Sequence, residues 1–242
     1  KDNVPLVLMG DVLDSPRPTS KIVDFLLDCT KAMKDRGLPV YWIDGNHDRA
    51  IPSWGDVIGA TRLTDHPALI NEVSVSGIDN RSSTELESAL SKVHSDTDVL
   101  VCHQLLDLAC PMEGMYNMKA DWVPAHISTV LMGDYHVAQD YQHPGRANQR
   151  FYYSGSTAQL SLSESCNKSI LKVSVGADIE ISRVPLVTRK CFAYTVTNQI
   201  ELDVLVAQRD EWFSEFKLAE GMSDIAMPIL NIKFDTNVPH VL

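Results

Sequence analysis

Four short apolar runs along the chain each end in a cluster of polar residues. They occupy residues 4–9, 39–43, 98–102 and 128–132. The runs lack the alternation of a half-buried strand, which is typical of strands buried on both faces of a parallel sheet. A helix is predicted between the first two, from Thr19 or Ser20 to about Arg36, because apolar residues recur at helical spacing and Gly37 follows. Strand, helix and strand in this order predict a βαβ unit with a parallel pair.

The remaining sequence predicts further elements and a second domain. Before residue 150 we expect a strand over 68–76 and a helix over 83–94. Residues 49–66 are expected to be irregular, and residues 107–126 to form a long excursion. Later, apolar and polar residues alternate, which predicts an antiparallel second sheet over 168–175 and 178–184. A strand, an amphipathic helix and a strand then follow at 191–196, 200–218 and 228–234. We therefore place a first domain over 1–186 and the beginning of a second over 187–242.

The charge of the chain limits how it could meet a polyanion. Its 242 residues hold 21 Lys and Arg against 32 Asp and Glu, a formal net charge of −11. A nucleic-acid substrate would therefore require bound cations, a local basic patch or a partner. No apolar run reaches the roughly eighteen residues of a membrane-spanning helix. The 5 cysteines are scattered without metal-ligand spacing, which favours reduced thiols in a cytoplasmic or nucleoid-associated protein.

The polar clusters at the strand ends are rich in side chains that bind metal ions. In chain order they are Asp11 with Asp14, Asn46 with His47, His103, and Asp134 with His136. One such cluster is most often a salt bridge or a core histidine with its hydrogen bonds satisfied. Four at successive strand ends converge on one edge of a sheet, where open α/β folds bind ligands. Mixed Asp, Asn and His ligands suit manganese, iron or zinc better than calcium.

The spacing of these clusters is similar to that of a known enzyme family. It resembles the calcineurin-like binuclear metallophosphoesterases in Gly10-Asp11-x-x-Asp14, Gly45-Asn46-His47-Asp48, His103 and Gly133-x-x-His136. Finer features resemble one branch, the SbcD-type nuclease subunits of DNA double-strand-break repair, called meiotic recombination eleven in eukaryotes and archaea. These features are Pro16-Arg17-Pro18-Thr19-Ser20, His103-Gln104, and Tyr153-Ser154-Gly155-Ser156-Thr157 followed by Ser161-Leu162-Ser163-Glu164. The resemblance covers about residues 4–190.

The resemblance implies a fold, an activity and partners. The expected fold is α/β, a two-sheet αββα sandwich that here lacks its first strand, followed by the beginning of a small α/β capping domain. Such proteins are manganese-dependent DNA nucleases with 3'-5' exonuclease and single-strand endonuclease activity. They dimerise and bind an SbcC-like ATPase. We therefore expect two Mn²⁺ ions, with iron or magnesium as alternatives, and DNA, an SbcC-like ATPase and a second copy of the chain as partners.

The resemblance also assigns roles to single residues. It implies metal ligands at Asp11, which would bridge the two ions, and at Asn46, His103, Asp134 and His136. It implies catalytic roles for His47, which would protonate the leaving oxygen, and for Asp14, whose carboxylate would orient His47. Substrate phosphate would be met by Arg17 and Ser156. Asp48 is expected to fix the turn rather than to bind metal.

Two departures from the family pattern keep other functions open. The family begins with an Asp-x-His motif on its first strand, and no such motif precedes Val4. We therefore expect the sequence to begin inside the fold, with an incomplete first metal site. The usual Gly-His-x-His is replaced by Gly133-Asp134-Tyr135-His136, which shifts the preference toward harder cations. The alternatives are a phosphoesterase for small molecules or proteins, and a scaffold without catalytic activity.

Overall fold

The computed structural model describes residues 4–159, 161, 164, 167–176, 178–188, 191–215 and 229–234. The chain divides into two compact units, and each is described separately. The first unit comprises residues 1–155 and 171–182, and the second comprises residues 156–170 and 183–242. The boundary predicted at residue 186 remains a prediction, because the two units interleave along the sequence.

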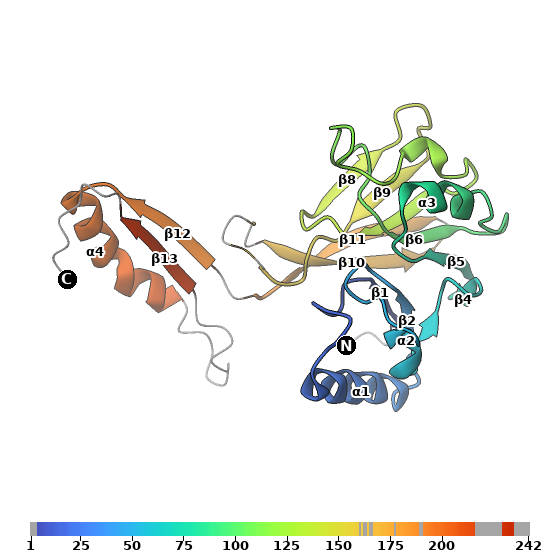
Figure 1. Ribbon diagram of the computed structural model, residues 1–242, viewed down its shortest axis with the longest axis horizontal. Helices are drawn as coiled ribbons and strands as arrows, with labels where there is room; N and C mark the ends of the chain where they lie inside the picture. Colours follow the sequence, from blue (N-terminus) through green and yellow to red (C-terminus); the bar gives the residue numbers. More distant parts are fainter. Residues whose placement is uncertain are drawn as a thin grey trace. The chain divides into compact units, whose positions relative to one another are not determined.

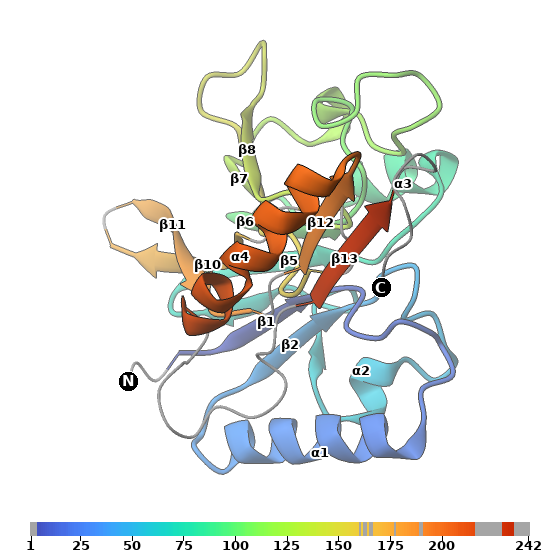
Figure 2. The same ribbon diagram turned by 90° about the vertical axis from the view of Figure 1, so that its left-hand side faces the viewer.

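The first unit begins with a three-stranded sheet in the order β1-β2-β3. Its parallel strands are β1 (Leu6–Met9), β2 (Val40–Ile43) and β3 (Thr61–Arg62). Helix α1 (Ser20–Lys34) connects β1 to β2, and the short α2 (Trp54–Val57) precedes β3. Figure 1 and Figure 2 show α1 running along the outer side of this sheet. The predicted βαβ unit is confirmed, with Met9 in register with Ile43.

A six-stranded sheet forms the second layer of the first unit, in the order β4-β5-β6-β7-β9-β8. Its strands are β4 (Ala68–Ile70), β5 (Val73–Ile78), β6 (Val99–His103), β7 (Thr129–Gly133), β8 (Gln139–Gln142) and β9 (Arg150–Tyr153). The central strands β5, β6, β7 and β9 are parallel, and β4 and β8 run antiparallel to their neighbours. Helix α3 (Ser83–Leu90) follows β5, and a 3₁₀ turn, η1 (Ala120–Trp122), lies between β6 and β7.

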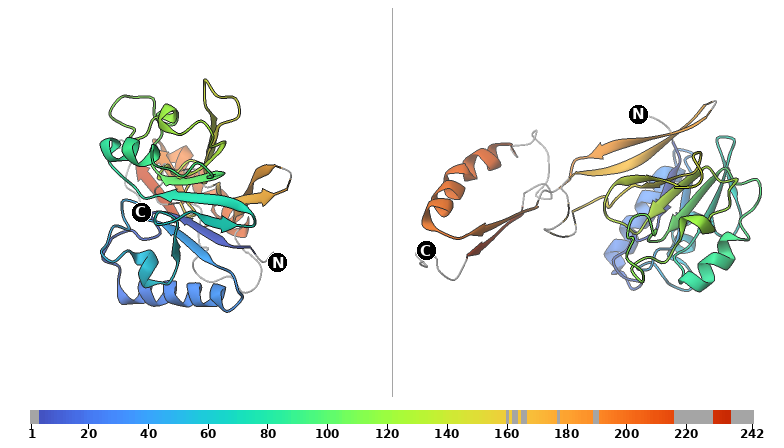
Figure 3. Two further views of the ribbon diagram at one scale, coloured as in Figure 1. Left: turned by 90° about the vertical axis from the view of Figure 1, so that its right-hand side faces the viewer. Right: turned by 90° about the horizontal axis from the view of Figure 1, so that it is seen from above.

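Apolar side chains fill the space on both faces of the six-stranded sheet. One buried cluster joins it to the three-stranded sheet and includes Tyr41, Ile43, Val75, Val101 and Leu131. The other cluster lies beneath α3 and the loop after β6, and it includes Leu86, Leu90, Leu100, Met118 and Phe151. Figure 3 (left) shows the two sheets facing each other, with α1 and α3 on opposite outer sides. Because both faces are covered, the central strands read as continuous apolar runs.

Three sequence predictions for the first unit were wrong in detail, one of them the end of the helix predicted over 83–94, which stops at Leu90. Residues 68–76 do not form one strand, because Asn71 and Glu72 adopt positive φ angles of 49° and 68° and turn the chain between β4 and β5. Strand β5 begins after this turn, at Val73, and extends to Ile78, two residues past the predicted end. Residues 49–66 are also not wholly irregular, since they contain α2 and β3. A Ser53 side chain that accepts a hydrogen bond from Gly55 N–H caps α2.

The second unit contains a βαβ arrangement. Strands β12 (Cys191–Val196) and β13 (Ile229–Phe234) pair in parallel, and α4 (Gln199–Glu215) lies between them in sequence. Before them, β10 (Lys168–Val175) and β11 (Ile179–Leu186) form a two-stranded sheet that contributes residues to both units. The part of the predicted helix beyond Glu215 lies outside the described residues. Among the described helices, none offers the length of apolar sequence that crossing a bilayer requires.

Candidate metal centre

Asp11 lies in the loop that leaves β1 with an unusual backbone. Gly10 has a φ of 83° and Asp11 a φ of 50°, so both residues adopt the left-handed region. This geometry turns the Asp11 carboxylate toward the end of β6. Its Oδ1 accepts a hydrogen bond from the main-chain N–H of His47 at 2.9 Å, which ties the two loops after β1 and β2 together. Its Oδ2 is left facing His103 at 3.2 Å.

His103, the last residue of β6, is held so that one ring nitrogen is available. Its Nδ1–H donates to the carbonyl oxygen of Met9 at 2.7 Å. The ring's Nε2 is buried and has no hydrogen-bond partner among the described residues. It lies 3.2 Å from Asp11 Oδ2 and 3.9 Å from Asp134 Oδ1, in ion-pair contacts rather than well-aligned hydrogen bonds. A buried ring nitrogen that faces two carboxylates without a well-aligned hydrogen bond is rare, and a bound ion would explain it.

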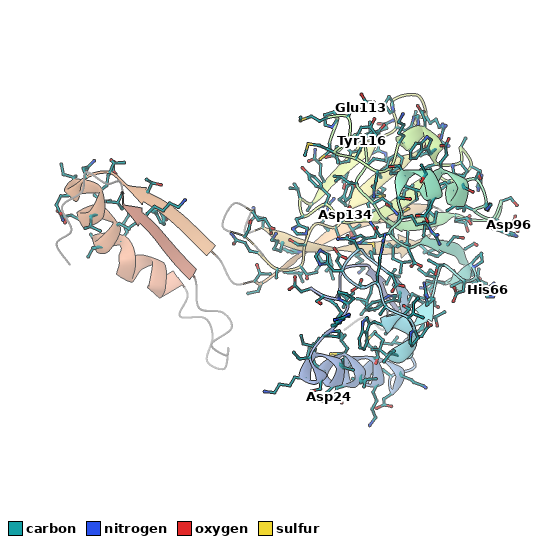
Figure 4. The ribbon with its side chains drawn as sticks, in the orientation of Figure 1. Asp24, His66, Asp96, Glu113, Tyr116 and Asp134 are labelled. Atoms are coloured by element: carbon teal, nitrogen blue, oxygen red, sulfur yellow. The ribbon has the colours of Figure 1, made fainter. Side chains whose placement is uncertain are left out.

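Asp134 completes a group of three possible ligands. Asp11, His103 and Asp134 each offer one ligand atom, and these atoms lie within 4.8 Å of one another. Asp134 follows β7 with a φ of 83°, a conformation that side-chain-bearing residues rarely adopt and that is typical of functional sites. In the view of Figure 4, Asp134 lies near the middle of the first unit, whereas Asp96 and His66 lie at its edge. Two loops with constrained backbones and the end of β6 therefore bring these side chains to one point.

The pKa values of Asp11, His103 and Asp134 are shifted by burial and by their charges on one another. Burial raises the pKa of Asp134, and the nearby Asp11 carboxylate adds to this rise. Burial alone would lower the pKa of His103, but its contacts with Asp11 hold this pKa above the usual value. The same contacts keep the pKa of Asp11 below its usual value against the effect of burial. Two carboxylates that share one histidine leave a local negative charge that a cation would neutralise.

Glycines make room for this close approach. A β-carbon at Gly45 would collide with the carboxylate of Asp11, and one at Gly10 or Gly133 would collide with the ring of His103. The first glycine of each motif is thus required by the space around the candidate ligands. The cradle, the buried nitrogen and the two carboxylates together fit a divalent cation.

The side chain of Asp48 stabilises the turn after β2. This fully buried carboxylate accepts hydrogen bonds from the main-chain N–H groups of Gly45 at 3.0 Å, Leu13 at 2.9 Å and Val12 at 3.4 Å. It therefore joins the loop that carries Asp11 to the turn that carries Asn46 and His47. Burial raises its pKa, although the three hydrogen bonds oppose this shift. The geometry gives Asp48 the role expected of it.

His47 contacts the main chain of Asp14 and not its carboxylate. Its Nδ1 lies 2.9 Å from the main-chain carbonyl oxygen of Asp14, so the ring donates Nδ1–H to the backbone. The resemblance to the metallophosphoesterases implies the Asp14 carboxylate for this contact. The side chain of Asp14 is exposed instead. The orientation of His47 therefore depends on the path of the loop after β1, not on an acidic side chain.

Asp79 and Asn80, directly after β5, are not among the residues that the sequence predicts for the site. Asn80 N–H donates to Asp44 O at 2.8 Å, and its Nδ2 donates to His103 O at 2.9 Å. The Asp79 carboxylate accepts from Asp44 N–H at 2.7 Å and pairs with Arg62 at 2.6 Å. This segment therefore braces the ends of β2 and β6, which carry candidate ligands. An Asp-Asn pair directly after a strand could have indicated these residues. The strand was predicted to end at residue 76, so the pair did not stand at a predicted strand end.

The other predicted site residues have different surroundings. Asn46 is exposed and precedes His47 in the turn after β2. His136 is exposed and lies outside the group of three, but its charge acts on Asp134. Arg17 is exposed in the loop before α1. Ser156 belongs to the second unit, where its hydroxyl receives a hydrogen bond from Lys168 at 2.6 Å and donates to Glu164 at 3.3 Å. The substrate-binding roles of Arg17 and Ser156 remain predictions.

Comparison with known proteins identifies relatives from archaea. The chain is 23% identical over 218 residues to the DNA double-strand break repair protein Mre11 of Methanococcus maripaludis, covering 79% of this chain and 58% of that protein. It is 24% identical over 247 residues to Mre11 of Sulfolobus acidocaldarius, covering 95% of this chain and 64% of that protein. It is 29% identical over 193 residues to Mre11 of Haloferax volcanii, covering 76% and 43% respectively.

The comparisons agree with the motifs, although the identities are low. No protein-family model matches the chain. In these alignments the chain spans between 43% and 64% of the length of the relatives. The resemblance predicted from the strand-end motifs is confirmed: this chain is similar to the Mre11 proteins of DNA double-strand break repair.

Proposed function

We propose that this chain is the nuclease part of an Mre11-like protein, which hydrolyses phosphodiester bonds of DNA with the help of bound metal ions. The observation that carries the proposal is the buried Nε2 of His103, which faces Asp11 and Asp134 and has no hydrogen-bond partner among the described residues. Similarity to proteins named for double-strand break repair supports DNA as the substrate. The local negative charge of the ligand group supports a requirement for cations.

The proposed site would hold two Mn²⁺ ions, with iron or magnesium as alternatives. Asp11 would bridge them, since a carboxylate has two oxygens and Oδ2 already faces His103. The other proposed ligands are Asn46, His103, Asp134 and His136. When bound, such a pair of ions stabilises the charge on both the attacking and the leaving oxygen of a phosphate displacement. The protein's own contribution is to hold the ligands rigidly, through Asp48 below the turns and Asn80 between the strands.

His47 is the proposed general acid. Its Nδ1–H is used by the Asp14 carbonyl, so the ring's Nε2 is the nitrogen that can carry a proton to the leaving oxygen. His47 is exposed, which suits a residue that contacts substrate. His103 is buried, which suits a residue that binds metal. Asp14 would orient His47 through its main chain.

The finer architecture and the assembly also belong to this proposal. The two facing sheets with α1 and α3 outside are what the αββα metallophosphoesterase sandwich requires, and the βαβ arrangement of β12, α4 and β13 suits the beginning of a capping domain. We further propose 3'-5' exonuclease and single-strand endonuclease activity, a homodimer, and an SbcC-like ATPase as partner.

A nuclease assay on the full-length protein tests the proposal against its alternatives. We expect cleavage of labelled linear DNA that is abolished by chelator and restored by Mn²⁺. A phosphoesterase for small molecules would hydrolyse a small phosphodiester in Mn²⁺ but leave DNA intact. A scaffold would do neither. DNA cleavage that persists at the same rate in chelator would rule out the metal mechanism.

A further inference from the structure

A row of basic side chains begins next to the candidate metal centre. Arg49 follows the His47-Asp48 turn directly, and its NH2 group donates to both the carbonyl oxygen of Asn80 at 3.0 Å and the Asn80 Oδ1 at 2.7 Å. Asn80 is itself bonded to Asp44 O and to His103 O. The guanidinium of Arg49 is therefore fixed relative to the strand ends that carry the candidate ligands.

The row continues along α3 in a shallow surface depression. Its volume is about 500 Å³, and its lining includes Arg81, Thr84, Ser88 and Lys92. Arg81 and Lys92 are exposed, and their side chains form no hydrogen bond or ion pair within the described part of the chain. Two cations and two hydroxyls thus face the solvent on and beside α3, together with the carboxylate of Glu85.

Arg49 lies close to Arg81, because its guanidinium donates hydrogen bonds to Asn80, the residue that precedes Arg81. The charge of Glu85, which lines the same depression, acts on both cations. Hydrogen bonds from Ser82 lower the pKa of Glu85, and the charges of Arg81 and Arg49 lower it further. Both guanidinium groups therefore lie within electrostatic reach of one carboxylate. That carboxylate is already occupied by the capping box at the start of α3. The patch keeps a net positive charge, in a chain whose formal net charge is −11.

We propose that Arg49, Arg81 and Lys92 form a binding site for the phosphodiester backbone of a nucleic-acid strand whose scissile bond lies at the metal centre. The inference rests on the proposed nuclease function and adds the path of the substrate. Arg81 and Lys92 flank α3, whose own length is roughly 10 Å at about 1.5 Å per residue. That length matches about three nucleotides at about 3.4 Å per nucleotide along one strand. Arginine and lysine are the side chains that most often meet phosphate, and the contact would not depend on base sequence.

Binding measured without cleavage tests this site. The full-length protein is titrated with labelled single-stranded and duplex DNA in chelator, over a series of salt concentrations. The test variant is Arg81→Gln with Lys92→Gln. The matched control is Lys34→Gln with Arg36→Gln, which removes the same charge from exposed positions at the end of α1 and just after it.

For the test variant we expect affinity at low salt to fall about tenfold or more, similarly for different base sequences. Each lost phosphate contact should reduce the slope of log K against log salt by about 0.7–0.9, so the double variant should lose about 1.4–1.8. Arg49→Gln should reduce affinity further when added. The control should stay within about twofold of the parent.

Equal losses in the test and control variants would overturn the site, because they would show only a response to total charge. So would a parent protein that does not bind DNA in chelator. Neither outcome touches the proposed nuclease function, which is read from metal-dependent cleavage. Manganese stoichiometry, measured on the same variants, reports separately whether the metal centre is intact.

Discussion

The ring of His47 is oriented by the backbone of Asp14, since Nδ1 of His47 lies 2.9 Å from the main-chain carbonyl oxygen of Asp14. A contact of this kind survives the loss of the Asp14 side chain. It also fixes the tautomer of a neutral His47, because a carbonyl oxygen can only accept. Because the contact is to the backbone, Asp14→Ala and His47→Ala should have different effects on the rate. A contact through the Asp14 carboxylate would make their effects similar.

His47→Ala should lower single-turnover cleavage of DNA by about 10²–10⁴-fold, the usual contribution of a general acid. Manganese stoichiometry should stay near that of the parent. Asp14→Ala should retain most of the rate, since the carbonyl remains. If Asp14→Ala loses as much rate as His47→Ala, the Asp14 carboxylate has a role that the His47 contact does not explain. If His47→Ala loses its manganese, His47 is a ligand and not the acid.

Asp48→Ala should destabilise the protein and weaken manganese binding together. The substitution removes the acceptor of three main-chain N–H groups in a fully buried place. Each buried donor left without a partner costs about 1–3 kcal/mol. The matched control is Asp24→Ala on the exposed side of α1, where the change should stay within about 0.5 kcal/mol. Chemical denaturation and manganese titration measure the two effects. An Asp48 variant as stable as the control would contradict the role of Asp48 as a fastener.

Gly45→Ala should reduce manganese binding strongly, because the added β-carbon would collide with the Asp11 carboxylate. The control is Gly145→Ala, where the nearest atom outside the adjacent residues is 3.7 Å away, an ordinary contact. Isothermal titration with Mn²⁺ compares the two. Equal affinities would mean that the carboxylate can move aside without cost, and the cradle would then not be required.

Asp134→His should shift the metal preference of the site from harder toward softer cations. Aspartate offers a hard oxygen and adds negative charge, whereas imidazole suits zinc better. We expect the ratio of Zn²⁺ to Mn²⁺ affinity to rise in Asp134→His, and Asp134→Ala to weaken both. Competition titrations measure this ratio. An unchanged ratio in Asp134→His would show that residue 134 does not reach the ion.

Much of the site could be predicted because it lies where buried strands end. Parallel pairing places the ends of β1 and β2 side by side in one sheet, and those of β6 and β7 side by side in the other. The sequence predicts one sheet edge, whereas it is the packing of the two sheets that brings Asp11 to His103 and Asp134. The brace at Asp79 and Asn80 was missed because a tight turn at Asn71 and Glu72 was hidden within a β-rich run. Main-chain acceptors, such as the Asp14 carbonyl, leave no signature in residue types. Neither do side-chain contacts such as that between Ser156 and Lys168, which form across a loop.

Locating manganese directly tests the central claim. Crystals of the full-length protein soaked in Mn²⁺ should give an anomalous peak within coordination distance of Asp11 Oδ2 and His103 Nε2, with Asp134 alongside. The same soak of Asp11→Ala should leave this position without a peak. Manganese bound elsewhere in the parent protein, or at this position in both proteins alike, would contradict the claim that Asp11, His103 and Asp134 form the metal centre.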